Sequence, residues 1–268
     1  MLSIKSLSPL LWLTLLLATF SCSEYQKVLK SSNYDLKLEK ANEYFVEQEY
    51  AKAIALYDEL LTIYKGTAQS EDIYFSYSYC HFHTKDYLLA GHYFSSFANT
   101  FPNSPKAEEA EYMAAYCYYK DSPPSSLDQT FTLKAITEMQ AFINRHPGSE
   151  RVKEANEIID RLRSKLEDKS FQSAKLYYDL GDYKASIAAL KNSLNEYPDS
   201  RHREEITFLI LKSSYLLAAN SIEEKKLERY KNTEKEYYTF VAAFPESSYL
   251  NEAQRFKQQT EEFLTSIK

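Results

Sequence analysis

Apolar side chains recur along this chain with the spacing of buried helix faces. The clearest face has the spacing i, i+3, i+7 and i+10 and consists of Tyr87, Ala90, Phe94 and Phe97. A helix brings such positions onto one side, and a side this apolar must be covered by a neighbouring element. Pro102 follows and cannot continue the helix, so the stretch predicts a buried helix that ends in a turn.

The residues after this turn predict the start of another helix. Ser104 offers a hydroxyl as its cap, and Pro105 suits the first helical turn. Glu108 follows three residues after Pro105 and four after Ser104, and it is expected to act as the acidic partner of a capping box. The sequence therefore predicts a helix, a proline turn and a second helix that Ser104 caps.

The same unit recurs along the chain. An aromatic residue or His, then Pro, any residue and Ser, stands at 101–104, 146–149, 197–200 and 244–247, and the prolines are 45, 51 and 47 residues apart. Acidic-aromatic steps open three helical faces, at Glu49-Tyr50, Asp86-Tyr87 and Asp182-Tyr183. Small residues precede aromatic ones at fixed offsets, as in Ala41 with Tyr44 and Ala174 with Tyr177. This spacing resembles the tetratricopeptide repeat, a unit of about 34 residues with two antiparallel helices.

The repeats predict an all-α fold. The expected helices are residues 37–47, 50–64, 70–84, 87–100, 105–120, a helix from about 130, then 152–180, 183–196, 203–219, 222–244 and 249–268. Residues 122–129 are expected to be a loop, because paired prolines after a charged residue break a helix. Together these elements predict a right-handed superhelical array of about five tetratricopeptide-like helix pairs.

Residues 1–21 are typical of a signal peptide. Lys5 supplies the positive start, residues 10–18 are apolar, and Ser21 directly precedes Cys22. The apolar run is too short to span a bilayer. A signal that ends before a cysteine resembles a bacterial lipoprotein signal, in which Cys22 is lipidated, while an ordinary secretory signal that happens to contain a cysteine stays the alternative. Residues 22–34 are expected to be a tether.

Composition argues against several classes of function. Removal of residues 1–21 takes away Lys5 and no acidic residue, so the formal charge changes from −6 to −7, and we expect no nucleic acid partner. With 4 glycines the chain cannot build a Gly-rich phosphate loop, and we expect no cofactor.

No arrangement of residues indicates an enzyme or a metal site. His81 and His83 are two residues apart, so on a helix they diverge by about 200° and cannot share one metal ion. Acidic clusters such as Glu108-Glu109 are typical of solvated helix faces. Cys80 and Cys117 remain after maturation, and the sequence leaves open whether they form a disulfide or two buried thiols.

One stretch resembles a known family. The run F-P-N-S-P-K-A-E-E-A-E-Y-M-A-A-Y-C-Y-Y, followed by the loop Asp128-Gln129-Thr130, is similar to the BamD family, and so are Cys22 and the tetratricopeptide-like pairs. The resemblance implies a non-enzymatic lipoprotein of the outer-membrane β-barrel assembly machine, anchored in the outer membrane and facing the periplasm. Its implied partners are unfolded outer-membrane proteins and the POTRA domains of the barrel subunit. Residues 35–150 would then bind substrate, and residues 151–268 would dock the partner.

The repeat geometry selects a candidate peptide groove. In tetratricopeptide arrays the groove is lined by the first helix of each pair, three before, one after and four after a small residue. With Ala41, Ser78 and Ala115 as the small residues, the rule selects Leu38, Asn42, Phe45, Phe75, Tyr79, Phe82, Tyr112, Tyr116 and Tyr119. Each triad has the spacing i, i+4, i+7 and forms a stripe on one helix face. The stripes suit an extended segment that ends in aromatic residues, and the resemblance implies the C-terminal β-signal of an unfolded outer-membrane protein. The alternative is that these side chains pack between helices.

Two other classes of function stay open. One is a tetratricopeptide scaffold lipoprotein of the cell envelope, and the other is a lipoprotein that binds sugar or peptide nutrients. The adaptor interpretation predicts an essential protein, whereas a nutrient binder can be deleted.

Overall fold

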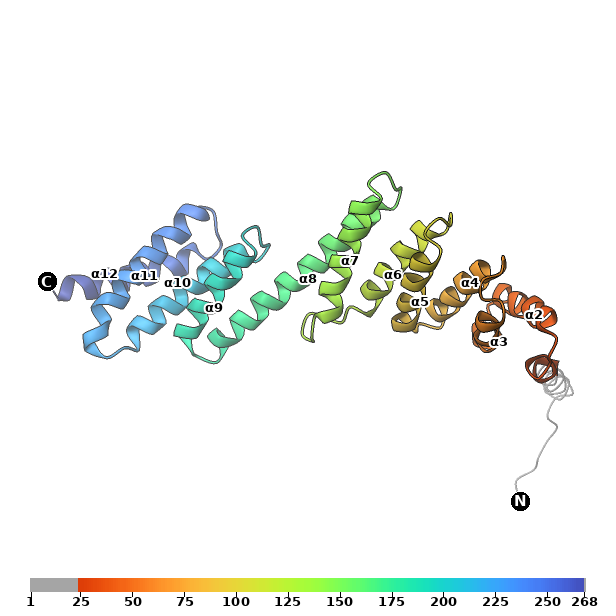
Figure 1. Cartoon of the computed structure of the whole chain (residues 1–268). Helices are drawn as coiled ribbons and strands as arrows, with labels where there is room; N and C mark the ends of the chain where they lie inside the picture. The colour runs from red at the N-terminus through yellow and green to blue at the C-terminus, as the bar shows by residue number, and fades with distance from the viewer. Residues whose placement is uncertain (1–23, 268) are drawn as a thin grey trace, which may run out of the picture. The chain divides into compact units, whose positions relative to one another are not determined.

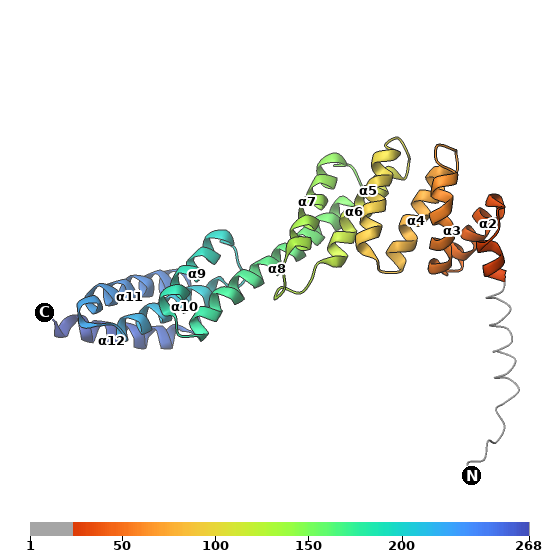
Figure 2. The same cartoon turned by 60° about the horizontal axis from the view of Figure 1, so that its bottom comes forward.

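The chain is helical throughout the part that its computed structural model describes, residues 24–267 (Figures 1 and 2). The predicted signal peptide, residues 1–21, and the predicted lipidation site, Cys22, lie outside the described residues. The prediction of an all-α fold built from successive helices is confirmed. The superhelical path and its handedness stay predictions.

The described chain divides into two units that share one helix. The first unit holds residues up to Pro123 and Gln129–Leu162, and the second holds Pro124–Asp128 and residues from Arg163 onward. The helices of the first unit are α2 Tyr34–Val46, α3 Tyr50–Ile63, α4 Ser70–His83, α5 Tyr87–Thr100, α6 Ala107–Asp121, α7 Thr130–Arg145 and the start of α8 Val152–Asp179. The second unit holds the rest of α8, α9 Tyr183–Glu196, α10 Arg203–Ala219, α11 Glu223–Ala243 and α12 Leu250–Ser266.

The turns inside three helix pairs share one hydrogen-bond pattern. A backbone N–H donates to the carbonyl five residues earlier, in Glu49 to Tyr44, Asp86 to His81 and Asp182 to Tyr177, at 2.8, 2.9 and 3.0 Å. The residue before each donor is left-handed, with φ of 63°, 64° and 78° at Gln48, Lys85 and Gly181. This is the Schellman geometry, which closes one helix and reverses the chain.

The acidic-aromatic steps seen in the sequence start the helix that follows each turn. The carboxylates of Asp86 and Asp182 accept from the N–H groups of Leu89 and Ala185, at 3.3 and 3.0 Å. Each satisfies one backbone donor that the first helical turn leaves unpaired. Glu49, with a longer side chain, makes no such bond.

The proline turns join one helix pair to the first helix of the pair before it. The hydroxyls of Ser104, Ser149 and Ser200 each accept from the N–H two residues later, at 3.0, 3.2 and 3.0 Å. The same hydroxyls donate to the carboxylates of Glu71, Glu108 and Glu167, at 2.5, 2.6 and 2.8 Å. We call each of these pairs a serine latch.

The serine latches overturn one expectation. Helix α6 begins at Ala107 with Lys106 as its N-cap residue, so Ser104 does not cap it. The Glu108 carboxylate accepts from Ser149 instead of closing a capping box. The seryl hydroxyl is used across helices because the turn around Pro105 places it beside the first helix of the preceding pair.

The first unit buries two apolar clusters. The first lies among α2, α3 and α4, and its largest fully buried side chains include Leu56 and Tyr57. Val28 belongs to this cluster and is 5% exposed, and residues 24–29 are helical. The predicted tether, residues 22–34, is therefore wrong over its described part, because its apolar pair packs on the first helices.

The second cluster of the first unit explains where the units divide. Phe94, Phe97 and Phe142 of α5 and α7 pack with Ala155, Ile158 and Leu162 of α8. The sequence placed the division at residue 150, whereas the structure has it between Leu162 and Arg163. The first part of α8 belongs to the first unit because its apolar side chains complete that core.

The second unit also has two smaller clusters. One joins Phe171 and Ala174 of α8 to Leu190 of α9 and to α10, and the other joins α10, α11 and α12 around Phe240. The loop residues of this unit are held by Lys169, whose ammonium donates to the carbonyls of Ser125 and Leu127 at 3.3 and 2.8 Å.

Candidate functional site

Six of the nine predicted groove residues form one continuous set of ring contacts on α4 and α6. We call this set the aromatic row, and it consists of Phe75, Tyr79, Phe82, Tyr112, Tyr116 and Tyr119. Within α4 the ring centroids of Phe75 and Tyr79 are 5.1 Å apart, and those of Tyr79 and Phe82 are 6.4 Å apart. Phe82 then contacts Tyr116 of α6 at 6.1 Å. These separations are within the range of favourable aromatic pairs.

The row is partly core and partly surface. Tyr112 is 2% exposed, and the other five side chains are half-buried against the second cluster of the first unit. The rings of Phe75 and Tyr79 both pack on Phe94, at 6.1 and 4.9 Å. Interhelical packing, the alternative that the sequence left open, thus accounts for part of each ring but leaves five of them accessible.

Hydrogen bonding fixes the position of Tyr79. Its hydroxyl donates to the carboxylate of Glu109 on α6, at 2.5 Å. Burial, and secondly the Glu109 carboxylate, raise the pKa of Tyr79 well above its usual range. Tyr79 is therefore a neutral, oriented ring at every physiological pH.

The first predicted triad is separate from the row. Asn42 is exposed and accepts a hydrogen bond from the Tyr57 hydroxyl at 2.7 Å, and Leu38 is half-buried in the α2–α4 cluster. Phe45 contacts Tyr50 edge-on at 5.9 Å. The triad on α2 thus has the predicted helical spacing but no direct ring contact with Tyr79.

His83 connects the two regions and was not selected by the sequence. Its ring stacks on Tyr50 at 4.5 Å and lies 5.9 Å from Tyr79. The sequence offered no reason to choose His83 over His81, because both stand on the same helix. Their roles differ in the fold: His81 is buried and stacks on Tyr93 at 5.3 Å.

Three cations lie against rings of the row. The Arg151 guanidinium is 4.7 Å from the Tyr112 ring centroid, Arg161 is 5.7 Å from Tyr119, and Lys106 is 5.2 Å from Phe75. Arg151 also pairs with Glu109 at 3.4 Å. Ring faces beside cations suit a segment that carries aromatic side chains and a carboxylate.

In the second unit, Lys175 and Lys212 occupy the helix positions that Tyr79 and Tyr116 occupy in the first unit. Glu109 lies seven residues before Tyr116, and Glu205 lies seven residues before Lys212. Tyr79 donates to Glu109 across 30 residues, and Lys175 donates to Glu205 across 30 residues at 2.6 Å. The offset used for Ala41, Ser78 and Ala115 also finds Lys175 when it is applied to Ala174, so this position could have been found from the sequence.

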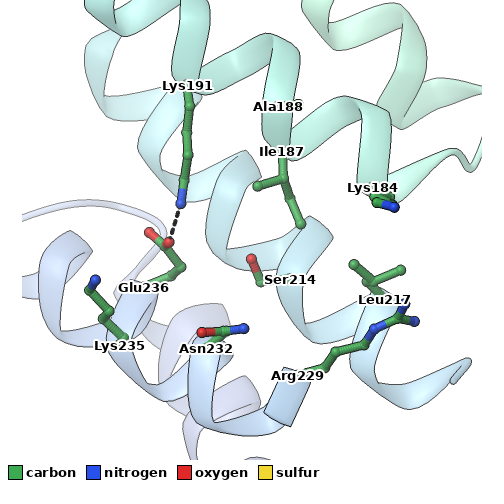
Figure 3. Close-up of a pocket in the computed structure, with 10 residues that line it drawn as sticks. All are labelled: Lys184, Ile187, Ala188, Lys191, Ser214, Leu217, Arg229, Asn232, Lys235 and Glu236. Carbon is green, nitrogen blue, oxygen red and sulfur yellow. Dashed lines mark hydrogen bonds and ion pairs between the residues drawn. The ribbon is translucent and has the colours of Figure 1, made fainter. Parts of the chain in front are cut away.

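A second candidate site is a pocket in the second unit, which Figure 3 shows in close-up. Its volume is about 330 Å³, and α9, α10 and α11 form its walls. The residues that line it are Lys184, Ile187, Ala188, Lys191, Ser214, Leu217, Arg229, Asn232, Lys235 and Glu236. We call it the basic pocket, because four of its ten lining residues are cationic and one is acidic.

Three other features of the described residues bear on function. Between residues 24 and 267 no group of His, Cys, Asp and Glu side chains is arranged to hold a metal ion. Cys80 and Cys117 are free, buried thiols, and burial raises the pKa of each to about 12. In this same range no helix combines the length and apolar character needed to cross a membrane.

Comparisons with known proteins bear on the same helices. Residues 33–199, more than half of the chain, match the model of the YfiO family, which is described as outer membrane lipoprotein. The chain is also 25% identical over 142 residues to outer membrane protein assembly factor BamD of Caulobacter vibrioides, a match that covers 53% of this chain and 47% of that protein. The chain thus matches about half the length of this curated relative.

Among solved structures, the TPR2AB-domain:pHSP90-complex of yeast Sti1 is similar over 86% of this chain and 99% of that one. The TM-score is 0.40 and the sequence identity is 11%. A likeness of this strength adds nothing to the helix pairs that are seen directly.

Proposed function

The chain belongs to the YfiO family of outer membrane lipoproteins, and on this premise we propose that it is a non-enzymatic subunit of the outer-membrane β-barrel assembly machine. The resemblance to the BamD family drawn from the sequence is confirmed by the family match and by the curated relative. In this role the chain binds unfolded outer-membrane proteins and docks on the POTRA domains of the barrel subunit.

The observation that supports substrate binding most directly is the aromatic row. It lies on α4 and α6, inside the residues that match the family. Five half-buried rings along two helices, with Arg161 beside Tyr119, offer apolar faces next to positive charge. An unfolded outer-membrane protein whose C-terminal β-signal ends in aromatic residues would place rings on Tyr79 and Tyr116.

Depletion of the protein tests the role as a whole. After depletion we expect the amounts of β-barrel proteins in the outer membrane to fall. Growth should also stop, because the proposed adaptor is essential. Unchanged barrels together with defects elsewhere in the envelope would favour the scaffold lipoprotein. A strain that tolerates deletion and fails only to take up sugars or peptides would favour the nutrient binder.

The membrane anchor is proposed at Cys22. A cysteine that carries acyl chains gains about 0.8 kcal/mol for each buried CH₂ group, and more than one chain anchors firmly. We expect the parent protein to partition into detergent and Cys22→Ser to stay in the aqueous phase. A parent protein that also stays aqueous would contradict the anchor.

Docking of the barrel subunit is proposed for the second unit. A fragment that starts near Arg151 is a poor test, because Ile158 and Leu162 would lose their partners in the first unit. In the full-length protein, Lys175→Glu with Lys212→Glu reverses two charges of the second unit and leaves the aromatic row intact. We expect capture of the barrel subunit to fall with this variant, and Tyr79→Ala with Tyr116→Ala to leave it unchanged.

A further inference from the structure

Of the four cations that line the basic pocket, only Lys191 forms an ion pair with a carboxylate of the described residues. Lys191 pairs with Glu236 at 2.6 Å (Figure 3). Arg229 donates to the Ser221 hydroxyl, which carries no charge. Among the described residues, Lys184 and Lys235 are both exposed and form no ion pair. Three positive charges therefore remain around the opening.

This charge is not a consequence of composition. The whole chain has a formal charge of −6. From Glu223 to Glu236, α11 carries five acidic and five basic residues. The lining nevertheless takes Arg229, Lys235 and one acid from this helix, and two lysines from α9. Helix α11 thus places two of these five basic residues but only one of the five acidic residues at the pocket, and the resulting positive charge raises the local concentration of anions there.

The floor of the pocket has a different character. Ile187 and Leu217 point into the space between the helices, and Ser214, which is 5% exposed, lies at its centre (Figure 3). The amide of Asn232 adds a donor and an acceptor at the edge. A bound molecule with an anionic group and an apolar group can thus pair with the cations of the rim and pack on the apolar side chains of the floor.

Size and exposure indicate what kind of molecule this occupant is. Sites for small ligands have volumes from about 300 Å³ and bury most of the ligand. The basic pocket is at the lower end of this range, and Lys184, Lys191 and Lys235 at its rim are all exposed. A free small anion would stay largely in water there, whereas a segment of a larger partner gains further contacts around the rim.

We propose that the basic pocket receives an acidic side chain, flanked by an apolar one, from an exposed segment of a protein partner. The carboxylate lies between Lys184, Arg229 and Lys235, and the apolar neighbour packs on Ile187 and Leu217. This inference rests on the proposed role as an adaptor and adds a chemically defined contact to the second unit.

The test uses the full-length protein and a short synthetic probe peptide that contains Glu next to Phe and has both ends blocked. Lys184→Glu with Lys235→Glu reverses two exposed charges at the rim. The matched control is Lys225→Glu with Lys231→Glu, which makes the same change in net charge on α11 outside the lining. We expect the rim variant to bind the probe at least about tenfold more weakly and the control to bind within about twofold of the parent.

Two further probes identify the chemistry. Replacement of Glu by Gln in the peptide should abolish the difference in peptide affinity between the rim variant and the parent. A rise in ionic strength from about 0.05 M to 1 M should abolish the same difference. Inorganic phosphate should compete weakly. Equal losses of affinity in the rim variant and the control would overturn the proposal. So would a Gln peptide that the parent binds as tightly as the Glu peptide, or phosphate that competes as well as the peptide.

Failure of this inference can be told apart from failure of the proposed function. If barrel proteins fall on depletion and the rim variant restores them fully, the adaptor role stands and the pocket contact is wrong. If depletion leaves barrel proteins unchanged, the adaptor role is wrong, and the peptide measurements still decide whether the pocket recognises acidic segments.

Discussion

The two units place different residues at one structural position. In the first unit, Tyr79 of α4 donates a hydrogen bond to Glu109 of the next first helix. In the second unit, Lys175 of α8 donates to Glu205 of the next first helix, and Lys212 pairs with Glu252 at 2.9 Å. The bond between helices is kept while the donor changes from a hydroxyl to an ammonium group.

This difference shows that the contact between neighbouring helices can stay the same while the side chain that makes it changes in charge. Burial raises the pKa of Tyr79, which is therefore neutral, whereas the hydrogen bond to Glu205 raises the pKa of Lys175, which is therefore charged. A row of neutral rings favours apolar and aromatic segments at any ionic strength. Lys175 and Lys212 instead form ion pairs with Glu205 and Glu252, and the strength of these pairs weakens with salt.

The largest expected effect concerns whether the units unfold separately. Phe94 in the first unit and Phe240 in the second are both fully buried. Replacement of either by Ala should cost about 3–5 kcal/mol, because the cavity cannot close completely. Hydrogen exchange should show loss of protection mainly in the unit that carries the change. Equal loss in both units would mean that α8 couples them into one cooperative body and would weaken the comparison.

The next largest effect distinguishes the tyrosines of the first unit from the lysines of the second unit by their contribution to peptide affinity. Tyr79→Ala with Tyr116→Ala should weaken binding of a peptide that copies a C-terminal β-signal by about 1–3 kcal/mol, if these rings are hot spots. Lys175→Ala with Lys212→Ala is the matched control and should leave that affinity unchanged. Titration calorimetry measures both. Thermal unfolding of each variant is needed alongside, because a large fall in the melting temperature of the tyrosine variant would assign its rings to the core.

A smaller effect is the loss of stability on removal of a serine latch, a feature that both units contain. The serine latches Ser149 to Glu108 and Ser200 to Glu167 lie in the first and second unit. Ser149→Ala and Ser200→Ala should each reduce the free energy of unfolding by about 1–2 kcal/mol, because each variant removes two hydrogen bonds. Chemical denaturation of the two variants should give similar values. A loss confined to one unit would show that the latches are not equivalent.

The smallest effect is a pH dependence of the second unit. Burial raises the pKa of Asp168, but hydrogen bonds from His202 and Arg201 outweigh it and hold the pKa below its usual value. A depressed carboxyl pKa adds stability above the unfolded pKa of about 4, and this stability is lost as the pH falls through the lower folded pKa. Because Arg201 is exposed, the contribution should be below about 1 kcal/mol.

Acid titration of the parent and of Asp168→Asn measures this contribution. The difference in unfolding free energy between the two should be constant near neutral pH and should shrink below about pH 4. A difference that does not change with pH would show that Asp168 acts through hydrogen bonds alone.

Helix existence and most helix bounds could be predicted from the sequence because they depend on short spacings. The 3.6-residue period of Phe94 and Phe97, the prolines and the aspartate caps all act within one or two turns of helix. The triads on α4 and α6 could be predicted for the same reason, since each triad occupies one helix face. The role assigned to Ser104 was wrong, because a seryl hydroxyl can serve either its own turn or a carboxylate more than thirty residues away.

By itself, then, the sequence determined the all-α fold, the order of the helix pairs, the turn positions and the aromatic character of the first helices, since each of these follows from neighbours in the chain. The tertiary structure alone decided that α8 belongs to two cores, that Ser104, Ser149 and Ser200 reach carboxylates of another helix, and that lysines of α9 meet Arg229 and Lys235 of α11 around one pocket. Those features join residues about 30 to 70 positions apart, and only the packing of whole helices fixes which side chains meet across such separations.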